Sequence, residues 1–219
     1  MAGGYMGKLL NVDLSSGTLA EEALDETLCR QYVGGYGVAA YLLYHRMPPG
    51  ADPLGPQNVL GFMTGPLTGT PALIGSRFIV LGKSPKTHTW GDANAGGHFG
   101  PKLKFAGFDG ILVSGISDKP AYLFINEGQA ELRDATHLWG KNVYALEKAL
   151  KAEHGEDVQI ASIGTSGERK SLLACVITDA GRAAGRSGLG ALMGAKKLKA
   201  IVVKGGLTVP LADPARIRA

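Results

Sequence analysis

Two glycine-rich stretches of this chain, ninety residues apart, decide how it folds. Residues 96–115 read GGHFGPKLKFAGFDGILVSG, and residues 186–205 read RSGLGALMGAKKLKAIVVKG. The two align without a gap, with Gly100 on Gly190 and an apolar triplet near the end of each. A repeated polar glycine loop, followed by a helical turn and a buried strand, indicates a duplicated domain with two related half-sites. Such a domain would suit a ligand that is itself double.

The elements predicted around the two stretches follow one order. Each half reads as a hairpin, a helix, a strand, a glycine loop, a second strand, a second glycine loop, a short helix and a final strand. The strands that carry this pattern are 8–14, 59–64 and 77–82 in the first half, and 121–126, 158–163 and 171–177 in the second. Because strands and helices do not strictly alternate, the sequence predicts an α+β fold rather than a doubly wound nucleotide fold. We expect mixed or antiparallel sheets in two halves related by pseudo-two-fold symmetry.

Composition excludes several classes of protein. The 23 basic and 19 acidic residues give a net charge of +4, which is too small and too scattered to favour nucleic acid. No run of 18 apolar residues predicts a membrane span, and the first residues lack the pattern of a signal peptide. The two cysteines, Cys29 and Cys175, are isolated and resemble free thiols of a cytoplasmic protein. Two thiols cannot hold a four-cysteine iron–sulfur cluster.

The chain divides into one domain and a short tail. Residues 1–207 contain both copies of the repeat and predict a single cofactor-binding domain. Residues 208–219 depart from the repeat, contain two prolines and begin a new helix at Asp213. We expect this tail to be the start of a linker to C-terminal domains that the sequence does not include.

Three segments combine glycine with polar groups in a way that core packing does not need. Arg77 follows a glycine at the start of a strand, 91–97 places Asn94 in a glycine loop, and 181–188 carries Arg182 and Arg186. Guanidinium forks and free backbone N–H groups bind phosphate oxygens well, and an amide oxygen is a hard ligand suited to magnesium. Taken singly, Arg77 also reads as a surface ion-pairing residue and Asn94 as a turn residue. The coincidence of all three loops in a duplicated frame favours a binding site.

The repeat gives the two halves different ligand atoms. Extended toward the N-terminus without a gap, the alignment of the two stretches places Asn94 opposite Ala184 and Ala93 opposite Ala183. One half would then offer a side-chain oxygen near the pseudo-axis, whereas the other could offer only main-chain carbonyls.

Several motifs resemble the N-terminal domain of aldehyde ferredoxin oxidoreductases. The matching stretches are 6–14, 62–70, 91–97, 104–110, 137–140 and 182–186, within a resemblance that extends from Tyr5 to Gly205. The resemblance implies a tungsten, or occasionally molybdenum, centre held by two pterin dithiolenes whose phosphates share a magnesium ion. It further implies oxidation of aldehydes to carboxylates, with electrons passing through a 4Fe-4S cluster to ferredoxin or to an iron–sulfur subunit. A homo-oligomer would also fit.

The resemblance also implies the site residues. The cofactor-binding positions are Arg77, Asn94, Ala95, Gly96, Arg182, Ala183, Gly185 and Arg186. Asn94, through its side chain, and Ala183, through its carbonyl, would ligate magnesium. No catalytic residue is expected in this part of the chain, because the cluster cysteines and the proton-transfer residues of the family belong to later domains. The fragment alone should therefore not turn over substrate.

One departure and two alternatives stay open. Many members of the family have arginine where this chain has Tyr36, so the role of the loop 34–37 is not carried over. Within the family, the chain could belong to a subunit of a larger complex, such as one that reduces aromatic thioesters. From another class, it could be a non-catalytic phosphate- or nucleotide-binding module that uses the same loops.

Overall fold

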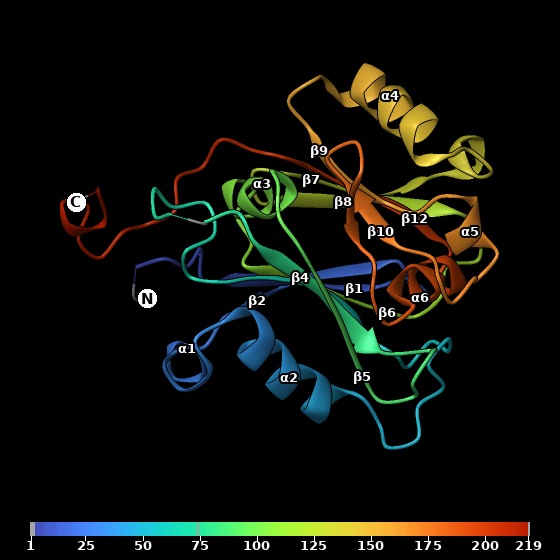
Figure 1. Ribbon diagram of the computed structural model, residues 1–219, viewed down its shortest axis with the longest axis horizontal. Coiled ribbons are helices and arrows are strands. Elements are labelled where there is room, and N and C mark those ends of the chain that lie inside the picture. Colours follow the sequence, from blue (N-terminus) through green and yellow to red (C-terminus); the bar gives the residue numbers. More distant parts are fainter. Residues whose placement is uncertain (1–2, 74, 219) are drawn as a thin grey trace.

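A computed structural model describes residues 3–73 and 75–218, which form two six-stranded sheets, one from each half of the chain (Figure 1). The first sheet has the order β2-β1-β6-β3-β4-β5, and the second has the order β8-β7-β12-β9-β10-β11. The strands are β1 Lys8–Asp13, β2 Thr18–Ala23, β3 Leu60–Thr64, β4 Phe78–Lys83, β5 Trp90–Ala95, β6 Gly110–Ser114, β7 Ala121–Asn126, β8 Gln129–Asp134, β9 Gln159–Ser162, β10 Val176–Thr178, β11 Arg182–Ala184 and β12 Leu198–Lys204.

The second sheet repeats the first strand for strand. β1 and β6 are parallel neighbours, as are β7 and β12, and the other neighbouring pairs in both sheets are antiparallel. The predicted α+β class and the predicted duplication are therefore confirmed. The short helices in the two glycine stretches, α3 and α6, also begin ninety residues apart.

The helices form three layers around the two sheets (Figure 1). α3 and α6 lie between the sheets and contact strands of both, while α1 and α2 cover the outer face of the first sheet and α4 that of the second. The helices are α1 Glu26–Tyr32, α2 Gly35–Arg46, α3 Phe99–Phe105, α4 Val143–His154, α5 Thr165–Glu168 and α6 Leu189–Ala195, with 3-10 turns at Thr136–Leu138 and Arg216–Arg218.

The main apolar core lies between the sheets and joins the halves into one unit. It contains Phe62, Phe78 and Phe99 from the first half together with Leu192 and Ile201 from the second, all almost fully buried. Removing this surface from water is the dominant favourable term in folding. A relative movement of the halves would re-expose it, so the loops at their junction have a rigid base.

The structure corrects two details of the sequence prediction. The strand expected at 171–177 is wrong for most of its length, because only Val176–Thr178 is extended. Lys170 is left-handed, with φ 57°, and the N–H of Ser171 donates back to the Ser166 carbonyl, so the chain turns there. The segments 91–97 and 181–188 are not pure loops, since they contain the edge strands β5 and β11.

Two buried ion pairs occupy related places in the halves. In the aligned repeat Asp109 falls on Lys199, and each is paired with a buried opposite charge. Lys104 Nζ lies 3.2 Å from Asp109 Oδ1, and Lys199 Nζ contacts Glu168 Oε1. Burial lowers the pKa of both lysines. These charges are therefore tolerated only because their partners are in place.

A third buried lysine, Lys196, should give the fold a pH dependence. Its ammonium donates to the Gly115 carbonyl at 3.0 Å, and burial lowers its pKa from 10.5 to about 8. Between these values the unfolded chain still holds a proton that the folded chain has released, so stability should rise with pH. From pH 8 to pH 10.5, the free energy of unfolding of the wild type should rise relative to that of Lys196→Met, by about 3 kcal/mol. Urea unfolding across this range measures both free energies. A difference between wild type and Lys196→Met that does not change with pH would contradict the shifted pKa.

The residues after the last strand run back past the N-terminal segment (Figure 1). Gly4 N donates to the Pro210 carbonyl, and Val209 is buried. Cys29 is a buried residue of α1 and Cys175 is half-buried, and both thiols are free. None of the helices within 3–73 and 75–218 combines the length and the apolarity needed to cross a bilayer.

Candidate cofactor-binding site

The edge strands β5 and β11 place Asn94 and Ala183 at equivalent positions. Across the first sheet, Gly110 pairs with Met63, Met63 with Ile79, and Ile79 with Asn94. Across the second sheet, the corresponding chain of partners is Ala200, Ser162, Ile177 and Ala183. Gly110 and Ala200 coincide in the ungapped repeat, so the structural counterpart of Asn94 is Ala183.

This equivalence corrects the pairing of Asn94 with Ala184. Ala184 is buried in the core between the sheets, as are Ala93 and Ala95, whereas Asn94 and Ala183 are exposed. A shift of one residue turns a side chain to the other face of a strand. The exposed Asn94 therefore corresponds to the exposed Ala183 and not to the buried Ala184. The second glycine loop is therefore one residue longer than the first.

Hydrogen bonds between side chains and the backbone join the second glycine loop to the first sheet. Ser187 Oγ donates to the Asp92 carbonyl at 3.1 Å and lies 3.2 Å from the Asp92 N–H, and Ser84 Oγ donates to the Ser187 carbonyl at 2.8 Å. Gly91 packs against the Ser187 side chain, where a Cβ would lie 3.0 Å from the Ser187 Cβ. The second glycine loop is thus fixed against the first sheet.

Asp179 makes a second junction between the halves. It lies with Ala180 in the turn between β10 and β11, and both residues are left-handed, with φ 48° and 54°. Its Oδ1 accepts from the His98 N–H at 2.9 Å, just before α3, and its Oδ2 is buried and makes no hydrogen bond to the described residues. Gly97, with φ 102°, leaves room for this carboxylate and for Arg182, since a Cβ there would lie 2.7 Å from Arg182 Cδ.

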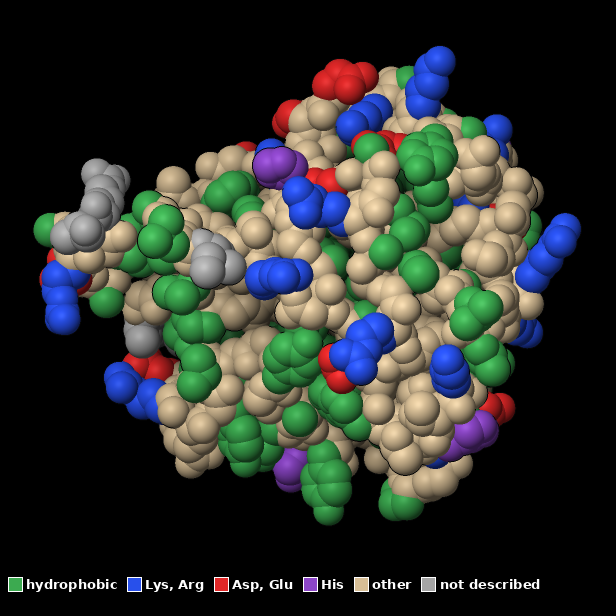
Figure 2. All heavy atoms as spheres, viewed as in Figure 1, with side chains coloured by type: hydrophobic (Ala, Val, Ile, Leu, Met, Phe, Trp, Pro, Cys, Tyr) green, Lys and Arg blue, Asp and Glu red, His purple; other side chains and the backbone are tan. Residues whose placement is uncertain are grey.

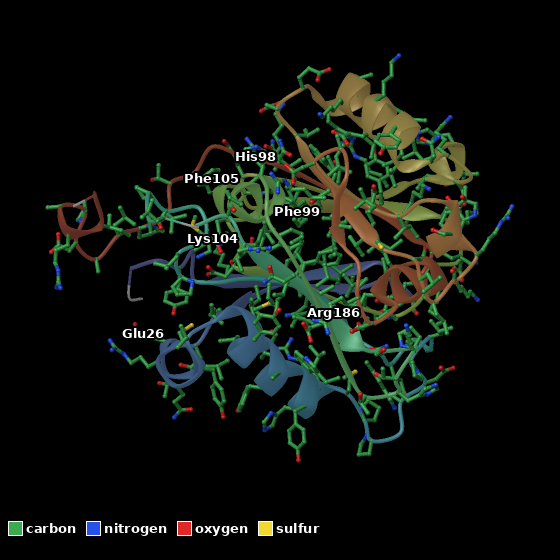
Figure 3. The ribbon with its side chains drawn as sticks, viewed as in Figure 1. Glu26, His98, Phe99, Lys104, Phe105 and Arg186 are labelled. Carbon is green, nitrogen blue, oxygen red and sulfur yellow. The ribbon has the colours of Figure 1, made fainter. Side chains whose placement is uncertain are left out.

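Three arginines surround this junction. A Cβ built on Gly96 would lie 3.7 Å from Arg77 Cδ and 4.0 Å from Arg182 Nη1, so the two side chains flank that glycine. Arg186 belongs to the second half and lies in the middle of the view in Figure 3, and its charge acts on Tyr36 of the first half. All three are exposed, and among the described residues none forms an ion pair or donates a side-chain hydrogen bond. Figure 2 shows basic side chains across the middle of the same face.

A cavity of about 320 Å³ opens beside these groups, with Tyr36, Arg77 and Asn94 in its wall. Tyr36 reaches it from the start of α2, where Gly34 and Gly35 adopt φ values of 153° and 46°. The charges of Asp92 and Arg186 act on the Tyr36 hydroxyl. Burial, together with the negative charge of Asp92, raises the pKa of Tyr36, so its phenol stays protonated at neutral pH.

Most of the residues singled out from the sequence lie together. Arg77, Asn94, Gly96 and Arg182 meet around the end of β5. Ala95 turns its side chain into the core, so only its backbone faces the junction. Ala183, Gly185 and Arg186 are exposed along the neighbouring edge and loop.

Sequence reasoning missed two residues of this junction, Asp179 and Ser187, and it did not place Tyr36 in the cavity wall. Asp179 and Ser187 act across 81 and 95 residues of chain, which no local pattern signals. For Tyr36 a signal existed, because a large polar ring lies among three glycines at 34, 35 and 37.

Comparison with known proteins shows the family of this chain. The family model "Aldehyde ferredoxin oxidoreductase, N-terminal domain" matches residues 9–205. The chain belongs to the aldehyde ferredoxin oxidoreductase family. It is 50% identical over 211 residues to the tungsten-containing aldehyde ferredoxin oxidoreductase of Pyrococcus abyssi, covering 96% of this chain and 35% of that protein. It therefore spans about a third of the length of these relatives, and matches their N-terminal domain.

Members of this family with other roles share the same domain. The WOR-like subunit of an aliphatic sulfonate oxidoreductase of Pyrococcus furiosus is 36% identical over 222 residues, covering 94% of this chain and 35% of that protein. The solved active site complex BamBC of benzoyl coenzyme A reductase superposes with a TM-score of 0.92 at 39% identity. This match covers 96% of the present chain and 32% of that one. A similar domain therefore occurs in proteins whose names state different reactions.

Proposed function

We propose that this domain seats a tungsten cofactor with two pterins, and that a magnesium ion joins the pterin phosphates between Asn94 and Ala183. The observation that carries the proposal is the equivalence of these two residues on adjoining edge strands. A ligand with two similar halves would meet the same backbone position twice. The Asn94 side-chain oxygen would approach from one strand and the Ala183 carbonyl from the other, and both are oxygen ligands that magnesium accepts.

The donor set fits the phosphates of such a cofactor. Arg77, Arg182 and Arg186 are exposed, lie around the two strand ends, and among the described residues have no carboxylate partner. At Gly96 the backbone stays open, since the nearest atoms to a Cβ there would be 3.6 Å or more away. Guanidinium groups and accessible N–H groups would bind and orient phosphate oxygens.

The bound metal would supply the two-electron chemistry, and this domain would supply placement. We propose that the longer protein oxidises aldehydes to carboxylates and passes electrons through a 4Fe-4S cluster in its C-terminal part to ferredoxin. In this scheme residues 1–207 are the cofactor-binding domain, and 208–219 begin the linker. The names of the tungsten-containing relatives support the metal, and their length supports the further domains.

A second candidate within the family is a subunit of a larger complex. It is favoured by the benzoyl coenzyme A reductase structure and by the WOR-like subunit, which share this domain. Since the same domain accompanies different chemistries, we infer that substrate choice rests with residues outside it. Titration of the chain with ATP would distinguish both family candidates from a nucleotide-binding module, because only the module should bind it.

Arg182→Ala in the full-length protein tests the site. Removing one charge-assisted contact to a phosphate costs about 1.5–3 kcal/mol, so cofactor retention should fall roughly tenfold to a hundredfold. Because Arg182 is exposed, the unfolding temperature should change little. Tungsten by elemental analysis and pterin by fluorescence of its oxidised form, both after gel filtration, measure retention.

The matched control is Arg169→Ala, which removes an exposed arginine at the end of α5 that is not in the wall of the 320 Å³ cavity. It should leave retention unchanged. Equal retention by the Arg182 and Arg169 variants would remove Arg182 from the site. Wild-type protein without tungsten, molybdenum or pterin would overturn the proposed function itself.

A further inference from the structure

Ser187 occupies a backbone conformation that serine rarely adopts. Its φ is 63°, in the left-handed region where glycine is favoured. In the aligned repeat Ser187 falls on Gly97, which is also left-handed, with φ 102°. The first half therefore uses the residue that suits this conformation, whereas the second half keeps a side chain there at a cost in strain. Such an outlier points to a separate role for the Ser187 hydroxyl.

The Ser187 hydroxyl takes the place of a neighbouring strand on the free edge of β5. Ser187 Oγ donates to the Asp92 carbonyl at 3.1 Å and accepts from the Asp92 N–H at 3.2 Å. Asp92 pairs with Leu81 of β4 on its other side, and in an antiparallel pair both main-chain groups of a residue face the same neighbour. One side chain from the second half thus satisfies both outward groups of Asp92.

These contacts fix a loop that has little other support. Arg186 and Ser187 lie in the loop between β11 and α6. Among the described residues, the hydrogen bonds of 185–187 all involve Ser187, and the third of them runs from Ser84 Oγ to the Ser187 carbonyl at 2.8 Å. The position of the Arg186 backbone therefore depends on its neighbour Ser187.

Arg182 is held in a different way. It is part of β11, where its backbone pairs with Thr178 of β10. Its place in the sheet therefore does not depend on the Ser187 hydroxyl. The second half contributes two arginines to the candidate site, and of these only Arg186 should respond to the loss of that hydroxyl.

We propose that Ser187 is a positioning residue that holds Arg186 against β5, so that its guanidinium meets a phosphate of the cofactor. The inference rests on the proposed function, because that phosphate belongs to the cofactor proposed for this site. Ser187 itself would contact neither the cofactor nor the substrate. Since Asp92 lies two residues before Asn94 on β5, the same contacts tie an arginine of one half to a candidate ligand of the other.

Ser187→Gly in the full-length protein removes the hydroxyl and suits the left-handed backbone. Relief of strain should offset the lost hydrogen bonds, so the unfolding temperature should stay close to that of the wild type. The rate at which pterin leaves the protein should rise about threefold to tenfold, as expected for the loss of one hydrogen bond. Pterin released during dialysis, measured by fluorescence of its oxidised form, gives this rate.

Glu127→Gly is the matched control, because it also places glycine at a left-handed position, with φ 46°. Glu127 lies in the turn between β7 and β8, and β8 is at the opposite end of the second sheet from β11. This variant should release pterin at the wild-type rate. Equal release by the two glycine variants would overturn the inference.

Two arginine backgrounds separate positioning from a general structural role. With Arg186→Ala present, Ser187→Gly should cause no further rise, because the group that it positions is absent. With Arg182→Ala present, the full threefold to tenfold rise should remain. Equal rises in both backgrounds, or a wild-type rate for Arg186→Ala alone, would overturn the inference and leave the proposed cofactor in place. Wild-type protein without pterin would instead overturn the proposed function, and the inference with it.

Discussion

Asp109→Ala is expected to lower the free energy of unfolding by about 3–5 kcal/mol, because it leaves a buried ammonium without its counter-charge. Lys104 is fully buried, and among the described residues its Nζ would keep only the Gly4 carbonyl as a hydrogen-bond acceptor. The substitution also removes the acceptor of the Gly7 N–H, which now lies 2.7 Å from Asp109 Oδ2. Denaturant unfolding of the chain measures the loss.

Two further variants make this result specific to the ion pair. Asp118→Ala removes an exposed carboxylate and should change stability by less than about 0.5 kcal/mol. Replacing the pair together, with Lys104→Met and Asp109→Leu, should recover much of the loss, because no charge is then left buried. A double variant as unstable as Asp109→Ala would assign the loss to packing instead.

Gly97→Ala should damage both the fold and the proposed site. A Cβ there would overlap the Asp179 carboxylate and lie 2.7 Å from Arg182 Cδ, and the residue is left-handed, with φ 102°. Backbone strain of this kind costs about 1–3 kcal/mol, and the overlap adds to it. Because relief would displace Arg182, the full-length protein should also lose cofactor by at least the factor expected for Arg182→Ala.

Gly140→Ala is the control that isolates the overlap. Gly140 is also left-handed, with φ 86°, but no atom lies near its Cβ position. It should show the strain alone and keep its cofactor. Thermal unfolding and tungsten content of the two variants, compared side by side, test the prediction. Equal unfolding temperatures and tungsten contents would mean that the overlap of a Cβ at Gly97 with Asp179 and Arg182 has no effect.

The duplication could be predicted because short sequence patterns repeat in the two halves. The glycine stretches at 96–115 and 186–205 align without a gap, and each ends in an apolar strand that is buried on both faces. Such strands and the turns around them depend on neighbouring residues alone. Their order therefore sufficed to give the fold class.

The edge strands could not be predicted for a physical reason. β5 has one face in the core and one in solvent, and its buried residues are only glycine and alanine, which also suit a loop. β11 is three residues long. Their extended form is fixed by pairing with β4 and β10 rather than by propensity. The one-residue error that paired Asn94 with Ala184 has the same origin, since the pleat appears only once the strands are paired.

The candidate site was predicted as a set of residue types rather than as an arrangement. Arg77, Asn94 and Arg182 carry groups suited to phosphate and magnesium wherever they lie. What brings them together is long-range: Ser187 on Asp92 and Asp179 on His98. These contacts depend on packing the two halves against each other, and no window of sequence contains both partners.

The shared strand order leaves each sheet closed to growth at both of its ends. At the outer ends, β2 carries Glu21 and Glu22, and β8 carries Glu131 and Arg133. Charged side chains on an outermost strand oppose the addition of a strand from another molecule. At the inner ends, β5 and β11 shield each other. The addition of a strand from another molecule is therefore disfavoured at either end of each sheet, and so are continuous intermolecular sheets.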